Sequence, residues 1–301
     1  MAKRFSKDER LIVDKFAPKS RFKFQGEEYE VLFSDKPTCS SGEPKTDIYV
    51  ACKSLSDQSS KEFKITFKKE NADFLENKVK PERAEQLLGE KWMDIVKAEV
   101  IKLKDKFLSK KLIYITRDWP TRAGSITLGW RFELFNKKQG LLSDKMDLTQ
   151  QQVIDIYAGT NLSPDKKNAM VADQVIKNSG VADYIIEYNP AETDTLDMIA
   201  AQMIPIQKYV EQNPEIYFGC KAVNYRTLKD KYERGRSLAV YTEWSIVDNK
   251  LKPELIFEEP LLKDSNYIAD RTKEVLAQLG IETTEDITDD KVVSLEFIHN
   301  S

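Results

Sequence analysis

The sequence predicts a protein of the α/β or α+β class, with a mixed central sheet flanked by helices. Apolar and polar residues alternate strictly over 62–68, as in a strand with one buried face, and Ile48, Val50 and Cys52 share one side of a preceding strand. Apolar residues recur at three- and four-residue steps over 81–108, as along one face of a helix. Of the 301 residues, 41% are hydrophobic and 32% charged, which is typical of a soluble globular chain.

The composition excludes several classes of protein. No apolar run approaches the roughly 20 residues of a membrane span, so we expect no membrane partner. The basic N-terminal segment 1–10 lacks an apolar signal core, and the three cysteines show no paired spacing, so we expect a cytoplasmic location. His299 is the one histidine, which argues against Ser-His-Asp hydrolysis and histidine-based zinc sites. Any chemistry must therefore rest on carboxylates and lysines, with or without a metal ion.

The N-terminal part predicts a helix and three strands. Residues 6–16 open with Ser6 in N-cap position and acids in the first turn, which favours a short helix. Glu9 lies in this helix, and whether it faces a site or solvent stays open. Residues 28–34 alternate as in a strand, and a polar loop leads to a hairpin.

The hairpin carries the most informative residues. Asp47 opens its first strand, and a polar turn centres near Asp57. The second strand has an apolar face and an opposite face of four polar residues: Glu62, Lys64, Thr66 and Lys68. A charged strand face turned to water is common and needs no function. A site built on these side chains is the competing interpretation.

The remaining elements follow from the same signals. Pro81 suits the first turn of the helix over 81–108, and residues 112–119 and 125–135 are predicted strands. The order is then helix, three strands, helix and two strands. Further along we expect helices at 149–157, 165–178, 195–212 (kinked at Pro205) and 265–279 (closed by Gly280), and strands at 215–223, 237–247, 251–258 and 291–298.

This order, together with Pro44-Lys45-Thr46-Asp47 and Glu62-Phe63-Lys64, resembles the PD-(D/E)XK nucleases, and most of all a Type II restriction endonuclease. The resemblance covers about the first 135 residues. It implies a restriction-endonuclease-like core over residues 1–140. Residues 141–301, expected to be mostly helical with further strands, would form a DNA-recognition and dimerisation region packed on that core; a single continuous domain stays open as the alternative.

The resemblance also implies the roles of the hairpin residues. Asp47 and Glu62 would bind Mg²⁺ with the backbone carbonyl of Phe63, and Lys64 would orient or deprotonate the attacking water. The register of the hairpin leaves an alternative open, because all four polar residues share one face. A turn near Leu55, or a bulge, brings Glu62 opposite Asp47. A turn near Asp57 instead places Thr66 or Phe67 there and brings Lys68 to the site. We favour Glu62 and Lys64, with Lys68 as the alternative catalytic lysine.

Segregated charge suggests where DNA binds. The net charge is −3, but segments 97–111 and 221–236 each carry six basic residues against two acidic ones. Arg226, Arg234 and Arg236 are candidate base contacts, since arginine can pair with guanine; phosphate contacts or plain exposure stay open. The resemblance implies a homodimer, since enzymes that cut both strands of a palindrome are commonly two-fold symmetric.

The sequence thus predicts a Mg²⁺-dependent endonuclease that hydrolyses double-stranded DNA at a specific short sequence. Two alternatives stay open: a structure-specific repair or recombination nuclease of the same superfamily, and a non-catalytic DNA-binding protein.

Overall fold

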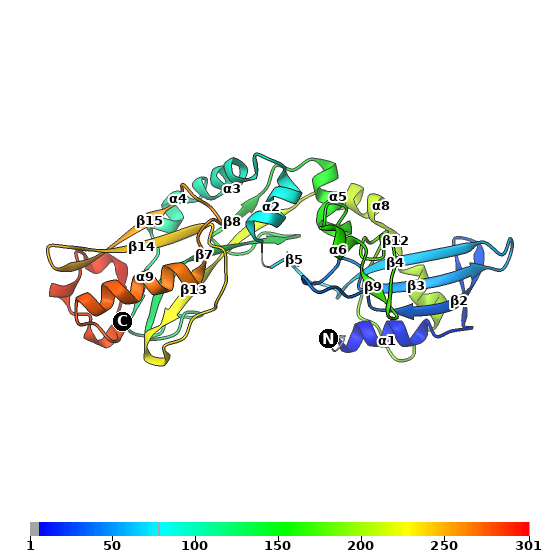
Figure 1. Ribbon diagram of the computed structural model, residues 1–301, viewed down its shortest axis with the longest axis horizontal. Coiled ribbons are helices and arrows are strands. Elements are labelled where there is room, and N and C mark those ends of the chain that lie inside the picture. The colour runs from blue at the N-terminus through cyan, green and yellow to red at the C-terminus, as the bar shows by residue number, and fades with distance from the viewer. Residues whose placement is uncertain (1–5, 78, 301) are drawn as a thin grey trace. The chain divides into compact units, whose positions relative to one another are not determined.

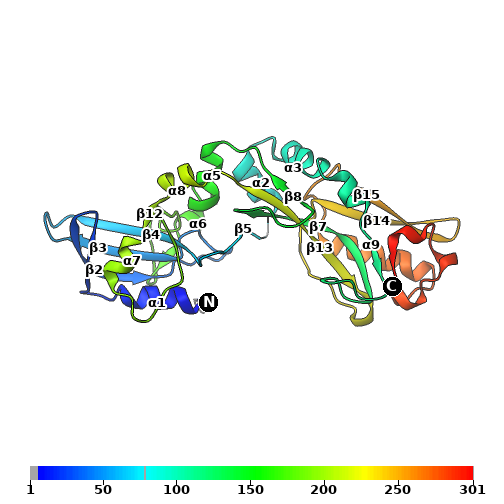
Figure 2. The same ribbon diagram turned by 180° about the vertical axis from the view of Figure 1, so that it is seen from behind.

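The chain folds into two compact units, each built from two separate stretches of sequence (Figures 1 and 2). The computed structural model describes residues 6–77 and 79–300, so the first five residues of the basic N-terminal segment lie outside it. Of the described residues, unit 1 comprises 6–73 and 148–214, and unit 2 comprises 74–77, 79–147 and 215–300. The boundary expected at residue 140 is therefore wrong, because the chain leaves unit 1 after Asp73 and returns to it at Leu148. The predicted α+β class is confirmed.

Unit 1 is a six-stranded sheet with helices. The strands run in the order β1-β2-β3-β4-β11-β12, antiparallel from β1 to β4, with β11 parallel to β4. Its elements are α1 (Lys7–Lys15), β1 (Arg21–Phe24), β2 (Glu27–Asp35), β3 (Ile48–Ser54), β4 (Ser60–Lys68), α5 (Gln150–Ala158), α6 (Pro164–Lys167), β9 (Met170–Val171), β10 (Gln174–Val175), β11 (Tyr184–Glu187), α7 (Leu196–Ala201), β12 (Ile204–Pro205) and α8 (Ile206–Gln212).

The main core of unit 1 lies between the sheet and two helices, α1 and α7. Ile12 of α1 and Phe16, which directly follows the helix, are fully buried against the apolar faces of β3 and β4, including Phe63 and Ile65. The predicted N-terminus of α1 is confirmed: the Ser6 hydroxyl accepts from the Glu9 amide, and Glu9 accepts from the Ser6 amide. This packing leaves the polar face of β4 on the other side of the sheet.

Unit 2 is built around a second sheet in the order β15-β14-β7-β13-β8, with β5 and β6 also pairing with β7. Its elements are β5 (Phe74–Glu76), α2 (Pro81–Leu88), α3 (Trp92–Ile101), α4 (Lys104–Leu108), β6 (Ile113–Tyr114), β7 (Ser125–Phe135), β8 (Ser143–Lys145), β13 (Tyr217–Arg226), η1 (Thr227–Lys229), β14 (Val240–Val247), β15 (Lys250–Ile256), α9 (Ser265–Gln278), η2 (Thr284–Asp286), η3 (Asp289–Lys291), η4 (Leu295–Phe297) and β16 (Ile298–His299).

Several predicted elements are confirmed, and others are shorter or different. The strands near 28–34, 125–135, 215–223, 237–247 and 251–258 and the helices at 149–157 and 265–279 are present. The helix over 81–108 is three helices, and Gly89, at a φ of 80°, ends the first of them, α2. The expected helix 195–212 is α7, β12 and α8 in succession.

Two further predictions of regular structure are wrong over most of their length. Of 112–119 only β6 is strand, and of 291–298 only Ile298 is. The predicted helix 165–178 is the short α6 followed by the β9–β10 hairpin, whose turn residues Ala172 and Asp173 have positive φ. Val171 of this hairpin is buried against Tyr49, so tertiary packing outweighs the local helical pattern.

None of the helices within the described part of the chain is both long and apolar enough to cross a membrane.

Candidate functional site

The register of the β3–β4 hairpin decides which polar residues lie near Asp47. Ile48 pairs with Ile65, and the Asp47 amide donates to the Ile65 carbonyl at 2.9 Å, so Asp47 lies opposite Thr66. Glu62 pairs with Ala51. At about 3.3 Å per residue, that is roughly 13 Å further along the strand. The expectation that Glu62 faces Asp47 is wrong, because the pairing continues without a bulge to a turn closed between Ser54 and Ser59.

The Asp47 carboxylate is held by β4. Its Oδ2 accepts a hydrogen bond from the Phe67 amide at 2.8 Å and another from the Thr66 hydroxyl at 3.2 Å. Thr66 is 2% exposed, while Asp47 and Lys68 are partly exposed. Among residues 6–77 and 79–300, no ion pair involves Lys68 and no hydrogen bond reaches Oδ1 of Asp47. One carboxylate oxygen and one lysine ammonium are thus available at this site.

The loop before Asp47 is fixed by a close backbone contact. The amides of Lys45 and Thr46 both donate to the Gly180 carbonyl, at 3.0 and 3.2 Å. A Cβ on Gly180 would lie 1.9 Å from the Lys166 carbonyl oxygen, so only glycine fits without movement. This contact explains how a segment 133 residues away in sequence places Asp47 at the start of β3.

A second acid comes from α1. Glu9 Oε2 accepts from Lys36 Nζ at 2.6 Å, and the two side chains are 15% and 10% exposed. Lys36 lies directly after β2, and both charges act on the pKa of Asp47. The site therefore contains two carboxylates, Asp47 and Glu9, and two lysines, Lys68 and Lys36. The sequence offered no signal for Lys36, since its partner is 27 residues away on another element.

Burial has the largest effect on Asp47 and raises the pKa of its carboxyl above the ordinary value. The Lys68 ammonium and the Phe67 amide act in the opposite direction, and the Glu9 charge raises the pKa further. Asp47 is thus held where its charge is costly. Perturbed carboxylates of this kind are common at functional sites and also occur in structural ion-pair networks.

The other residues predicted for this site lie elsewhere along the hairpin. The Tyr49 hydroxyl donates to Glu62 at 2.6 Å, and Lys64 pairs with Asp183 at 3.1 Å. Phe63 is fully buried in the main core of unit 1. In the observed register, Phe67 occupies the position next to Asp47 that was expected for Phe63.

The oxygen donors at this site fit Mg²⁺ better than a metal that needs an all-protein cage. The described part of the chain contains no group of three or more His, Cys, Asp or Glu side chains placed to hold a metal ion. Mg²⁺ usually binds through one or two carboxylates, with waters and substrate phosphates filling the other positions. Asp47 and Glu9 are two such carboxylates, although Lys36 already holds one oxygen of Glu9.

The three candidate DNA-binding arginines all lie in unit 2 and differ in their surroundings. Arg226, the last residue of β13, is partly buried, and Arg234 is exposed with its guanidinium 5.7 Å from the Tyr232 ring centre. Arg236 Nε donates to Glu233 at 2.7 Å, so its charge is already paired.

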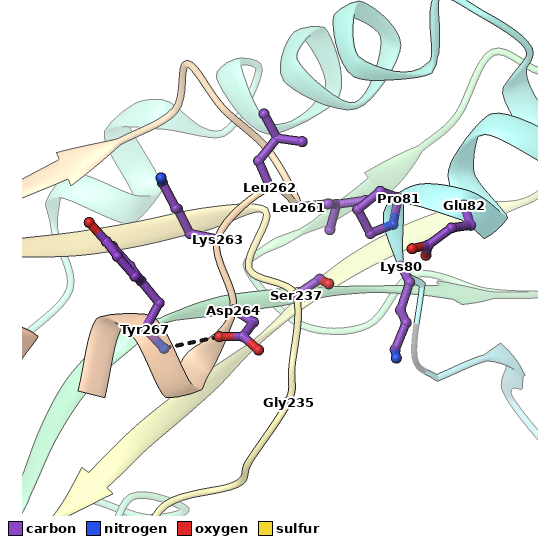
Figure 3. A pocket seen from close by; sticks show the side chains of 10 residues that line it. All are labelled: Lys80, Pro81, Glu82, Gly235, Ser237, Leu261, Leu262, Lys263, Asp264 and Tyr267. Carbon is purple, nitrogen blue, oxygen red and sulfur yellow. Dashed lines mark hydrogen bonds between the residues drawn. The ribbon is translucent and has the colours of Figure 1, made fainter. Parts of the chain in front are cut away.

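Unit 2 also contains an open pocket of about 440 Å³ between the start of α2 and the segment that leads into α9 (Figure 3). Its lining includes two lysines and two acids, whose charges cancel, and none of the predicted site residues. The lining residues are Lys80, Pro81, Glu82, Gly235, Ser237, Leu261, Leu262, Lys263, Asp264 and Tyr267.

Comparison with known proteins gives no relative: no protein-family model, curated protein or solved structure matches the chain.

Proposed function

We propose that this protein is a Mg²⁺-dependent endonuclease that hydrolyses phosphodiester bonds of double-stranded DNA. The observation that carries the proposal is the position of Asp47 next to the β3–β4 ladder: its carboxylate accepts a hydrogen bond from Thr66, and the Lys68 ammonium counteracts the rise in its pKa that burial causes. Unit 1 supports it, since α1, β2, β3, β4, α5 and β11 come in the helix–three strands–helix–strand order implied by the resemblance to PD-(D/E)XK nucleases, with β1 added before β2 and α6, β9 and β10 inserted before β11.

Four residues of the site have a role in this proposal. Asp47 and Glu9 would hold the magnesium ion, which when bound polarises the phosphate and acidifies a water ligand. The unpaired ammonium of Lys68 attracts the scissile phosphate and orients the attacking water beside it. Thr66, in the position expected for the second acid, positions Asp47 by donating to Oδ2.

The finer assignment is a Type II restriction enzyme, cutting at a specific short sequence as a homodimer in the cytoplasm. The three free cysteines, two of them buried, support a reducing location. Unit 2 would then supply DNA recognition, with Arg234 as the exposed arginine among the three candidates. A monomeric mass in sedimentation at cutting concentrations would contradict the dimer.

The first test is incubation of the full chain with unmethylated phage DNA in Mg²⁺ and in chelator. We expect discrete fragments in Mg²⁺ only, and their loss in Asp47→Ala with the fold retained by circular dichroism. Cleavage confined to branches or ends would instead indicate a structure-specific nuclease.

A non-catalytic DNA-binding protein is the second candidate, and two observations favour it. Thr66 stands where the family pattern has an acid, and Lys36 already neutralises Glu9. DNA binding by folded wild-type protein, without cleavage of any substrate in Mg²⁺, would support this candidate over the nuclease.

A further inference from the structure

Trp119 in unit 2 is the most exposed large apolar side chain in the described part of the protein, at 78%. The other three tryptophans, Trp92, Trp130 and Trp244, are 8%, 3% and 5% exposed. Burial of a tryptophan removes a large apolar area from water, so a nearly fully exposed indole is costly unless it contacts a partner.

The turn that carries Trp119 is well anchored. It connects β6 with β7, and Asp118 and Thr121 exchange two backbone hydrogen bonds, of 2.6 and 3.2 Å, across it. At its base the Gly124 amide donates to the Tyr114 carbonyl at 2.8 Å, and Gly124 accepts from the Thr227 amide. Trp119 is thus displayed on a closed turn rather than on an open loop.

Positive charge flanks the indole. The Arg117 guanidinium lies 4.9 Å from the centre of the Trp119 ring, a cation–π contact, and Arg122 is exposed three residues further along. Within residues 6–77 and 79–300, neither arginine forms an ion pair. Asp118 is the one acid in the turn, so residues 117–122 carry a net positive charge.

The neighbouring element adds to this charge. Ser125, at the start of β7, pairs with Arg226 at the end of β13, and η1 follows with the exposed Lys229. Leu228 of η1 packs where a Cβ on Gly124 would lie, 2.5 Å from its Cγ. The Trp119 turn and the basic end of β13 therefore form one continuous surface of unit 2.

We propose that this surface is a DNA contact in which Trp119 stacks on a nucleobase while Arg117 and Arg122 bind flanking phosphates. An aromatic face next to unpaired arginines matches the alternation of base and phosphate along a DNA strand. An apolar groove of a protein partner would bury the indole but would leave the two arginines without counter-charges. The proposal rests on the proposed function for the identity of its partner and extends it by naming where unit 2 grips DNA.

The test uses Trp119 as its own reporter. The full chain is titrated with a short duplex and with a single strand in chelator, so that no cleavage occurs, and tryptophan emission is followed. We expect quenching by DNA, and its loss in Trp119→Phe, because the three buried tryptophans do not contact the ligand. Stronger quenching by the duplex would indicate a paired base as the stacking partner, and stronger quenching by the single strand would indicate an unpaired base.

Heparin, a polyanion without bases, is the control for stacking. It should compete with DNA for the protein without quenching Trp119, and equal quenching by heparin would overturn stacking.

Affinity measurements supply the matched controls. Trp119→Ala should weaken DNA binding by about tenfold, with Trp119→Phe within about threefold of wild type, because stacking on aromatic side chains contributes that order of affinity. Tyr267→Ala, which removes an exposed aromatic ring with Lys263 over it elsewhere in unit 2, should leave affinity unchanged. An equal loss in the Tyr267 variant would overturn the assignment of the surface.

The arginines are tested by salt dependence. The logarithm of the DNA affinity falls as the logarithm of the salt concentration rises. Replacing both Arg117 and Arg122 by alanine should make this negative slope shallower by about two, one for each phosphate contact that is lost. Arg271→Ala, at an exposed arginine paired with Glu274, should not change it. If the protein cleaves DNA but Trp119→Ala leaves its DNA affinity unchanged, the inferred contact at Trp119 is overturned while the proposed nuclease function stands. Quenching of Trp119 by DNA without any cleavage would contradict the nuclease and leave the inference standing.

Discussion

Asp47 shows how one residue can combine a structural cost with a functional use. Its carboxylate receives two hydrogen bonds from β4, yet burial and the Glu9 charge raise its pKa. Replacing the Asp47 carboxylate by a neutral group would remove the free-energy cost of burying its charge. It would also remove the carboxylate that the proposed chemistry needs as a Mg²⁺ ligand. Sites that keep such a group commonly lose stability in exchange for function.

This cost predicts a pH dependence of stability. A carboxyl whose pKa is raised in the folded state contributes fully below its unfolded pKa of about 3.9, and this contribution is lost as pH rises through the folded pKa. We therefore expect wild-type protein in chelator to lose stability relative to Asp47→Asn as pH rises from about 3 toward neutrality. Urea unfolding of both proteins across that range measures the difference. Parallel pH profiles would show that Asp47 is not the group responsible.

The sequence predicted Asp47 but not its surroundings. The position of Asp47 follows from local signals: a polar loop and then an alternating apolar strand. Glu9 and Lys36 meet only because α1 packs beside the end of β2, and the pattern of either segment carries no information about that contact.

At the scale of elements, the β3–β4 hairpin determines the chemistry by its register. Alternation placed Glu62, Lys64, Thr66 and Lys68 on one face correctly but did not fix which of them lies at Asp47. The turn between Ser54 and Ser59 fixes it, and the Tyr49–Glu62 hydrogen bond uses the acid that the family motif assigned to metal. Register is a property of turn geometry, which the polar residues at 56–60 left open.

The loop before β3 gives a prediction about positioning. Gly180→Ala should lower the free energy of unfolding by about 1–3 kcal/mol, because its Cβ overlaps the Lys166 carbonyl. The same shift should move the Lys45–Thr46 segment. We expect it to reduce Mg²⁺-dependent cleavage by about 10²-fold, as is typical when a catalytic group is misplaced.

Gly219→Ala is the control for that experiment. Its Cβ would lie 2.7 Å from the Phe135 ring in unit 2, so a similar loss of stability is expected without an effect on Asp47. Unchanged activity in Gly180→Ala, at a temperature where it is folded, would contradict the positioning role of this loop.

The element predictions that failed did so for identifiable physical reasons. Strong alternation and strong helical periodicity gave β2, β7 and α9 correctly. Segment 165–178 has a helix-compatible composition, yet Val171 is buried against the sheet and the chain reverses at Ala172 and Asp173. Long-range burial of this kind overrides a local preference worth only tenths of a kcal/mol per residue, roughly 0–0.7.

At the scale of the molecule, the path of the chain is what the sequence revealed least. The chain enters unit 2 soon after β4, the strand that carries Lys68. It returns to unit 1 at Leu148, and α5 and then β11, a further strand of the sheet, follow more than 80 residues after Lys68. No composition shift marks either crossing near residues 73 or 148. The predicted core of 1–140 therefore joined elements of two units.

Each unit should respond to damage in its own core. Phe63→Ala, at a fully buried ring of unit 1, should cost about 3–5 kcal/mol. Hydrogen exchange measured by mass spectrometry should then accelerate over 6–73 and 148–214, including β11, while β7 and β13 of unit 2 stay protected. Acceleration over 74–140 in place of β11 would contradict the discontinuous unit.

The central claim is that the observed register, with Lys68 beside Asp47, forms the active site. Single-turnover cleavage of DNA in saturating Mg²⁺ by Lys68→Ala and Lys64→Ala tests it most directly, because both lysines lie on the same face of β4. We expect Lys68→Ala to lower the rate by about 10²-fold or more and Lys64→Ala to stay within about threefold of wild type. The reverse result, with Lys64 essential and Lys68 dispensable, would contradict the account.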